Sequence, residues 1–365
     1  MNVVITGGGT AGHVFPALAV AAELRERGDA VIFVGSADGQ EARLVPAAGY
    51  RFEAVRAISA QTRFSMRSVR AFALAIRASR SIRPLIAGVD AVVGVGGFAS
   101  APGVLAARST GRPLVLVDPN SVPGIVNRIA ARWARVVATA FEATAAHLPA
   151  GTRVERTGNP IRAEIAAVAA DRARLAEEAR KVFGLEDGRG TIVVVGGSQG
   201  ALHLDRAVSD TLGPLSQRAD LQVLVSSGPA HEAVLRDAID PSAPLLVRVV
   251  PFIDRMDLAL AVADLAVSRA GASVAELAAC GLSAILVPYP HATDQHQDAN
   301  AREVAAAGAA VVVEDAALDG IVLARAILEL IDDPARLAAM ASAALAWARP
   351  DAARRVADLV REVAG

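Results

Sequence analysis

The sequence predicts an α/β protein with two doubly wound, Rossmann-like domains that face each other across a cleft. Short Val/Ile-rich runs alternate with Ala-rich helical segments, a rhythm typical of parallel sheets covered on both faces. This rhythm starts at Val3 and restarts at Thr191, within a chain of 365 residues. In both places the first strand leads into a glycine-rich turn and a helix, GGGTAGH and GGSQGA. Each such turn is suited to bind phosphate, because close backbone N–H groups and a helix N-terminus both favour an anion.

Each expected strand is a short apolar run bounded by turn residues. Those of the first half are residues 3–6, 30–35, 90–97, 114–119 and 135–139. Those of the second half are residues 191–197, 221–228, 245–250, 263–268, 283–290 and 309–315. The segments between them are expected to be helices. We therefore predict an N-terminal domain of residues 1–161, a C-terminal domain of residues 162–346, and a last amphipathic helix, 347–365, that packs back on the first domain.

Charge is distributed unequally along the chain. Residues 1–162 contain 19 arginines and 10 acids, a net charge of +9, although the whole chain has −1. Residues 56–83 contain seven arginines and no acid, interleaved with apolar side chains. This basic amphipathic segment suits an anionic membrane surface. It lacks lysine and clustered aromatics, so no nucleic-acid partner is expected. A nucleic-acid face and a merely solubilising helix remain the alternatives.

Cysteine content and hydropathy indicate the compartment. Cys280 is the single cysteine, so an internal disulfide is excluded. No leader is recognisable, and the longest charge-free runs are broken by Gly or Pro before reaching the roughly 20 apolar residues that a span requires. We expect a cytoplasmic protein that does not cross the membrane.

The first glycine loop satisfies the pattern GxGxxG at Gly7, Gly9 and Gly12. Dinucleotide binding also needs an acidic residue at the end of the second strand, and AVIFVGS has none there. The loop is therefore expected to contact phosphate rather than a nicotinamide or flavin cofactor. His13, in the first turn of the next helix, is the candidate general base or acceptor-phosphate ligand.

The second half carries residues suited to a sugar nucleotide. Glu276, after the turn SRAGAS, can accept two hydrogen bonds from a ribose. Ser198 would face a diphosphate, and Phe252 and Ile253 could form an apolar slot for a base, with buried packing as the alternative for both. The segment DQHQDAN, 294–300, offers amides for sugar hydroxyls. Its histidine matches no zinc spacing, so no metal is expected.

Together these motifs resemble one family closely. They are GGGTAGHVFPALAVA, GVGGFASAP, Asn120 before a helix, GNPIR, GGSQGA, PFID, SRAGASVAE and DQHQDANA. The family is the MurG family of lipid II-forming N-acetylglucosaminyltransferases, with GT-B architecture. The resemblance implies transfer of N-acetylglucosamine from UDP to the muramoyl C4 hydroxyl of lipid I, with inversion and without metal or cofactor. It also implies a peripheral protein on the cytoplasmic face of the cell membrane that serves peptidoglycan synthesis, cell shape and division.

The resemblance implies the following binding residues for UDP-N-acetylglucosamine: Thr10, Ala11, Gly12, Asn120, Arg162, Ser198, Ile253, Ala272, Ser273, Glu276 and Gln297. The first glycine loop is also expected to take the acceptor's diphosphate, together with Gly9, Gly97 and Ser100. His13 is the expected catalytic residue.

Several alternatives remain open from the sequence. Where the family usually has HEQN, this chain has VDPN, so Asp118 or another group competes with His13 as the general base. SRAGASVAE is one residue shorter than the related GALTVSE forms. A diacylglycerol glycosyltransferase, a UDP-sugar 2-epimerase and a nucleotide-sensing membrane scaffold share parts of this pattern.

Overall fold

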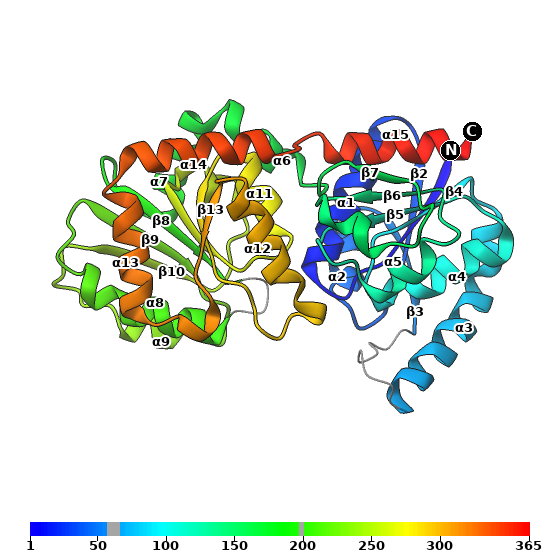
Figure 1. Ribbon diagram of the computed structural model, residues 1–365, viewed down its shortest axis with the longest axis horizontal. Coiled ribbons are helices and arrows are strands. Elements are labelled where there is room, and N and C mark those ends of the chain that lie inside the picture. Colours follow the sequence, from blue (N-terminus) through cyan, green and yellow to red (C-terminus); the bar gives the residue numbers. More distant parts are fainter. Residues whose placement is uncertain (57–65, 197–200) are drawn as a thin grey trace. The chain divides into compact units, whose positions relative to one another are not determined.

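The computed structural model describes residues 1–56, 71–196 and 201–365 in full, and residues 66–70 as backbone. The chain forms two compact units (Figure 1). Unit 1 comprises Met1–Arg162 and Arg349–Gly365, and unit 2 comprises Ala163–Ala348. Each unit is an open parallel sheet with helices on both faces, which confirms the predicted fold class.

Unit 1 contains a seven-stranded parallel sheet in the order β3-β2-β1-β4-β5-β6-β7. The strands are β1 (Asn2–Thr6), β2 (Ala30–Ser36), β3 (Arg51–Val55), β4 (Ala91–Gly94), β5 (Leu114–Asp118), β6 (Val136–Thr139) and β7 (Val154–Arg156). Central β1 pairs Val4 with Ile32 on one side and with Val92 on the other. The strand order reverses between β1 and β4. Open α/β sheets bind ligands at such a switch point, beyond the carboxyl ends of the strands.

Helices cover both faces of this sheet. They are α1 (Ala11–Glu26), α2 (Glu41–Ala47), α3 (Met66–Ala87), α4 (Ala101–Thr110), α5 (Ile125–Ala130) and α15 (Ala352–Ala364), with 3₁₀ turns η1 (Phe98–Ser100) and η2 (Ala143–His147). One apolar cluster joins α1 and α15 to the sheet, and the other joins α3 and α4. Helix α15 is also joined to the rest of unit 1 by ion pairs between Arg27 and Asp358, 2.6 Å, and between Arg361 and Asp29, 3.2 Å.

Unit 2 contains a six-stranded parallel sheet in the order β10-β9-β8-β11-β12-β13, which reverses between β8 and β11. The strands are β8 (Gly190–Val195), β9 (Leu221–Ser226), β10 (Leu246–Val250), β11 (Leu265–Ser268), β12 (Ser283–Leu286) and β13 (Ala310–Val312). The helices are α6 (Ala163–Ala166), α7 (Arg172–Phe183), α8 (Leu202–Leu215), α9 (Glu232–Asp237), α10 (Met256–Val262), α11 (Ser273–Ala279), α12 (His296–Ala306), α13 (Gly320–Ile331) and α14 (Pro334–Trp347). Three 3₁₀ turns complete the unit: η3 (Val168–Ala170), η4 (Thr293–Gln295) and η5 (Asp315–Ala317).

Within the described part of the chain, no helix combines the length and hydropathy of a membrane span. Cys280 is a free, buried thiol. Burial raises the pKa of this thiol to about 12, so it is not a nucleophile at neutral pH.

Candidate active site

In unit 1, the glycine loop after β1 packs against the turn after β4, at the switch point. A Cβ atom on Gly97 would come within 2.6 Å of the Gly8 carbonyl oxygen, and one on Gly7 within 2.8 Å of the Gly96 oxygen. Gly7 and Gly97 also have positive φ angles, 145° and 73°. Glycine is therefore required at both positions for the two backbones to meet.

His13 lies in the first turn of α1, beside this junction. Its Nδ1 is 3.1 Å from the hydroxyl oxygen of Thr10, which is exposed. A Cβ atom on Gly96 would lie 3.3 Å from the ring, so the imidazole packs directly on the second turn. The structure thus brings together Thr10, His13 and the turn at Gly97, as predicted from separate motifs. A half-buried imidazole oriented in this way is suited to general acid–base work.

Ser100 and Asn120 close the turns that follow β4 and β5. Ser100 is fully buried, and its hydroxyl donates to the Gly97 carbonyl at 2.7 Å. This bond assigns the Ser100 side chain to holding the turn rather than to direct contact with a diphosphate. Asn120 is half-buried, and its main-chain carbonyl accepts a hydrogen bond from the Thr144 hydroxyl at 2.9 Å.

Asp118, the competing candidate base, is buried beneath its own turn. One carboxylate oxygen accepts the Asn120 N–H at 3.1 Å. The other accepts the Gly124 N–H at 3.2 Å and the Asn127 amide at 2.9 Å. Burial raises the pKa of this carboxyl to about 7, although the three donors lower it. Both oxygens of Asp118 are therefore used within its own turn.

The raised pKa of Asp118 makes stability depend on pH. Between its ordinary value of 3.8 and about 7, the folded state holds a proton that the unfolded state has released. The contribution of Asp118 to the free energy of unfolding is therefore largest below pH 3.8, and it is lost as the pH rises through 7. We expect Asp118 to lower the free energy of unfolding by up to about 1.4 kcal/mol per pH unit in this interval.

The measurement is urea unfolding at pH 5 to 8 in a Trp347→Phe background, so that Trp133 reports on unit 1. Asp118→Asn should flatten the slope, and the same change at exposed Asp38 should leave it unaltered. An equal slope with and without the Asp118 carboxyl would contradict the assignment.

Arg162, the last residue of the first segment of unit 1, is held by α1. Its guanidinium carbon lies 4.5 Å from the centroid of the Phe15 ring, a cation–π contact. This contact places the predicted hinge arginine against the N-terminal part of α1.

In unit 2, the start of α8 is held by residues that sequence reasoning missed. Ser198 lies outside the described residues. Beyond it, the Ala201 N–H donates to a buried carboxylate oxygen of Asp205 at 3.2 Å, and His231 Nδ1 lies 2.6 Å from the same oxygen. Burial raises the pKa of Asp205. Asp205 could have been predicted from the sequence, because an acidic side chain four positions after Ala201 can reach back to the N–H groups at the start of the helix.

The predicted donor residues gather around the turn between β11 and α11. Ser273 begins α11, with its hydroxyl 3.3 Å from that of Ser268. Glu276 is half-buried one turn later. Gln297, from α12, accepts the Tyr289 N–H at 2.9 Å, and its amide nitrogen lies 3.8 Å from a Cβ position on Gly271. The predicted Ala272 is the N-cap of the same helix.

Arg269 lies in the same turn, and the sequence analysis did not identify it as a site residue. Its buried side chain holds the turn in place. Its side chain is 9% exposed and pairs with Asp315, while the same nitrogen donates to the Val287 carbonyl at 3.2 Å. The other oxygen of Asp315 lies 2.9 Å from His203 Nδ1. Burial acts to raise the pKa of Asp315, but the bonds from Arg269 and His203 hold it below its ordinary value.

Two further loops of unit 2 carry predicted site residues. The Ile253 side chain is 2% exposed and belongs to the interior, whereas Phe252 is 51% exposed. An aromatic contact to a base at this loop is therefore available from Phe252 rather than from the Ile253 side chain. Before α12, Asp294 and Gln295 have positive φ angles of 53° and 52°. Such strained non-glycine backbone concentrates at functional sites.

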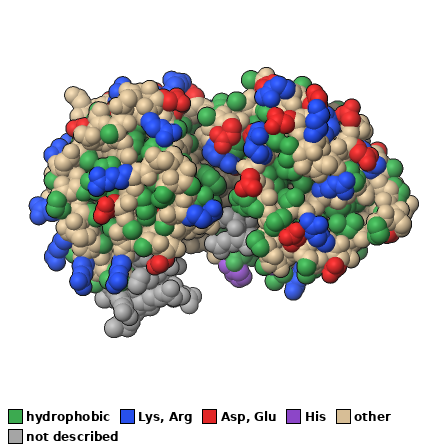
Figure 2. Space-filling model, turned by 180° about the vertical axis from the view of Figure 1, so that it is seen from behind, with side chains coloured by type: hydrophobic (Ala, Val, Ile, Leu, Met, Phe, Trp, Pro, Cys, Tyr) green, Lys and Arg blue, Asp and Glu red, His purple; other side chains and the backbone are tan. Residues whose placement is uncertain are grey.

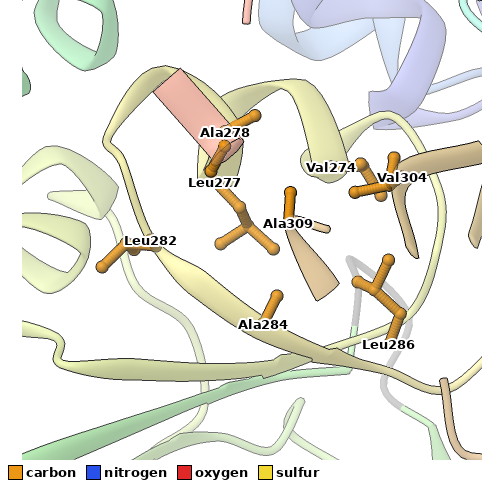
Figure 3. Close-up of a pocket in the computed structure, with 9 residues that line it drawn as sticks. Val274, Leu277, Ala278, Leu282, Ala284, Leu286, Val304 and Ala309 are labelled. Atoms are coloured by element: carbon orange, nitrogen blue, oxygen red, sulfur yellow. The ribbon is translucent and has the colours of Figure 1, made fainter. Parts of the chain in front are cut away.

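A cavity beneath α11 is not part of this site. Figure 3 shows its lining of aliphatic side chains from α11, β12 and α12, among them Leu277, Leu286 and Val304. It is a packing void of the core. In the described part of the chain, no group of three His, Cys, Asp or Glu side chains is arranged to hold a metal ion.

Comparison with known proteins identifies the family. The model of the glycosyltransferase family 28 N-terminal domain matches residues 3–139, and that of the C-terminal domain matches residues 191–356. Two relatives carry the name UDP-N-acetylglucosamine--N-acetylmuramyl-(pentapeptide) pyrophosphoryl-undecaprenol N-acetylglucosamine transferase. The protein from Acidothermus cellulolyticus is 43% identical, over 100% of this chain and 98% of its own. That from Halothermothrix orenii is 37% identical, over 100% and 99%.

A solved structure agrees with these relatives. The crystal structure of Acinetobacter baumannii MurG has a TM-score of 0.78 and 32% identity, and the similarity covers 99% of both chains. The resemblance predicted from the motifs is thus confirmed over the whole length. The chain belongs to glycosyltransferase family 28 and, within it, to the MurG family of N-acetylglucosamine transferases.

Proposed function

We propose that this protein transfers N-acetylglucosamine from UDP-N-acetylglucosamine to the muramoyl C4 hydroxyl of lipid I, forming lipid II for peptidoglycan synthesis. The observation that carries the proposal is similarity over the entire chain, at 37% and 43% identity, to transferases named for these substrates. Both glycine loops at the switch points support it, because a sugar nucleotide and a lipid-linked diphosphate both present phosphate.

Unit 2 is the donor domain in this proposal. Glu276 accepts the ribose hydroxyls, and the N-terminus of α8 with Ser198 meets the diphosphate. Gln297 and the strained segment before α12 contact the sugar. Ala272 and Ser273, at the start of α11, supply the adjoining backbone. Phe252 covers the uracil, and the Ile253 backbone lies beside it.

Unit 1 is the acceptor domain, and it supplies the base. The lipid's diphosphate meets Thr10, Ala11 and Gly12, while Asn120 and Arg162 border the reacting sugars. His13 takes the proton of the C4 hydroxyl as its oxygen bonds to C1 of N-acetylglucosamine. The bond between C1 and the UDP oxygen breaks on the opposite face, so the linkage becomes β. UDP leaves with the electron pair, stabilised by the α8 dipole, and no metal ion takes part.

The test is product analysis with a water-soluble lipid I analogue. Mass spectrometry should show the gain of one N-acetylhexosamine, and the anomeric coupling should show a β linkage. An α linkage would contradict the single displacement. A product only with diacylglycerol, or N-acetylmannosamine formed without acceptor, would favour the glycolipid transferase or the epimerase.

The membrane is the proposed partner of helix α3. Its buried face consists of Ala71, Ala75, Ala78, Ile82 and Ile86, spaced as one helical stripe that packs against α4. The remaining surface of the helix exposes arginines and Phe72, which is 63% exposed. Residues 57–65 of the predicted basic segment lie outside the described residues. Figure 2 shows that basic side chains predominate on the visible face of unit 1, in line with its net charge.

This surface is proposed to hold the protein on anionic lipid at the cytoplasmic face. The double variant Arg77→Gln and Arg80→Gln should weaken binding to phosphatidylglycerol vesicles about 30-fold, at about 1 kcal/mol per arginine. Co-sedimentation at low and high salt is the measurement, because added salt should weaken the binding of the unmodified protein. The matched control changes Arg325 and Arg336, exposed arginines of unit 2. Equal loss in both double variants would contradict the assignment, as would tight binding to duplex DNA or RNA.

A further inference from the structure

A buried carboxylate lies directly beneath the first glycine loop. Glu41, the first residue of α2, is 1% exposed. One of its oxygens accepts the Gly9 N–H at 2.7 Å, and the other accepts the Ser36 N–H at 2.8 Å. Both bonds have a charged acceptor and are short, which places them among the stronger hydrogen bonds of proteins. Glu41 thereby ties the loop after β1 to the end of β2.

The space for this carboxylate is built from three glycines. A Cβ atom on Gly8 would lie 2.2 Å from the carboxyl carbon of Glu41, and one on Gly39 would lie 2.2 Å from a carboxylate oxygen. A Cβ atom on Gly35 would lie 2.6 Å from Cγ. Any side chain at these positions would displace the glutamate. The absence of a side chain at Gly8, Gly35 and Gly39 therefore creates the space in which the Glu41 side chain lies.

We infer that Glu41 is a positioning residue for the acceptor reaction, an inference that rests on the proposed function. Its carboxylate occupies the Gly9 N–H, so a phosphate at that amide would lie against a buried negative charge. The diphosphate is received instead by the Ala11 and Gly12 amides at the start of α1, which precede the first N–H groups that bond to the Thr10 carbonyl, those of His13 and Val14. Glu41 fixes the direction of those amides and of His13, which lies in the same turn of α1.

The test variant is Glu41→Gln, which fills the same space. Its amide can accept one of the two N–H groups but turns an NH₂ group toward the other. We expect kcat/KM for the lipid I analogue to fall about 100-fold, because small displacements of positioned groups have effects of that size. The dissociation constant of UDP should change less than twofold. In nitrogen-15 spectra, the Gly9 or the Ser36 amide proton, whichever then faces the NH₂ group, should move upfield and lose protection from exchange.

Two further variants complete the experiment. Glu41→Asp keeps the charge but is too short to reach both amides, so it should show the same separation between acceptor and donor parameters. Glu53→Gln, on exposed β3, should change neither. A folded Glu41→Gln protein with unchanged kcat/KM for the acceptor, or with acceptor and donor parameters lowered equally, would overturn the inference. Absence of transfer by the unmodified protein would instead contradict the proposed function.

Discussion

Replacing His13 by alanine is expected to lower kcat roughly 10²- to 10⁴-fold, the usual contribution of a general base. The reason is geometric. Thr10 and the turn at Gly96 orient the imidazole, whereas both oxygens of Asp118 are used within its own turn. UDP affinity should change less than twofold, since the donor is assigned to unit 2. Single-turnover transfer and UDP titration are the measurements.

The matched control is His147→Ala, an exposed histidine in η2 of the same unit. It should leave kcat unaltered. Full turnover by the His13→Ala protein would remove His13 from the mechanism. A parallel loss of UDP affinity would place it in the donor site.

Replacing Glu276 by glutamine is expected to weaken UDP binding about 10- to 100-fold, because hydrogen bonds to charged groups contribute about 1.5–3 kcal/mol. Calorimetry with UDP and with 2′,3′-dideoxy-UDP separates this effect from a general loss of structure. The unmodified protein should discriminate strongly between the two ligands, and the variant should discriminate little. Such non-additivity is what two groups in direct contact produce.

The control for this prediction is Glu329→Gln on the exposed side of α13. It should bind both nucleotides as the unmodified protein does. Equal discrimination by Glu276→Gln would show that its carboxylate does not meet the ribose.

The fold was predictable from sequence wherever strands are buried. The central strands read as continuous Val/Ile runs because both of their faces are covered. Strands β3 and β7, the two edges of the first sheet, were missed because charged residues interrupt them, whereas β10 and β13, the edges of the second sheet, are rich in Val and were predicted. Residues such as Arg51, Glu53 and Glu155 face solvent there and break the apolar pattern.

The site was predictable where its residues lie close in sequence, as in the glycine loop with Thr10 and His13. Contacts between distant segments were not. Glu41 reaches Gly9 across 32 residues, and Arg269 reaches Asp315 across 46. Such pairs meet because the order of strands in the sheet brings distant segments together. The spacing of residues within a single motif does not reveal that order. Side-chain direction was equally hidden, as the buried Ser100 shows.

The most direct measurement is UDP release from UDP-N-acetylglucosamine in EDTA, with and without a soluble lipid I analogue. The proposed function predicts release that depends on the acceptor and is equal to the amount of disaccharide formed. Saturable UDP binding without acceptor-dependent release would contradict it and favour another acceptor lipid, an epimerase or a nucleotide sensor. Release that EDTA abolishes would contradict a metal-independent reaction.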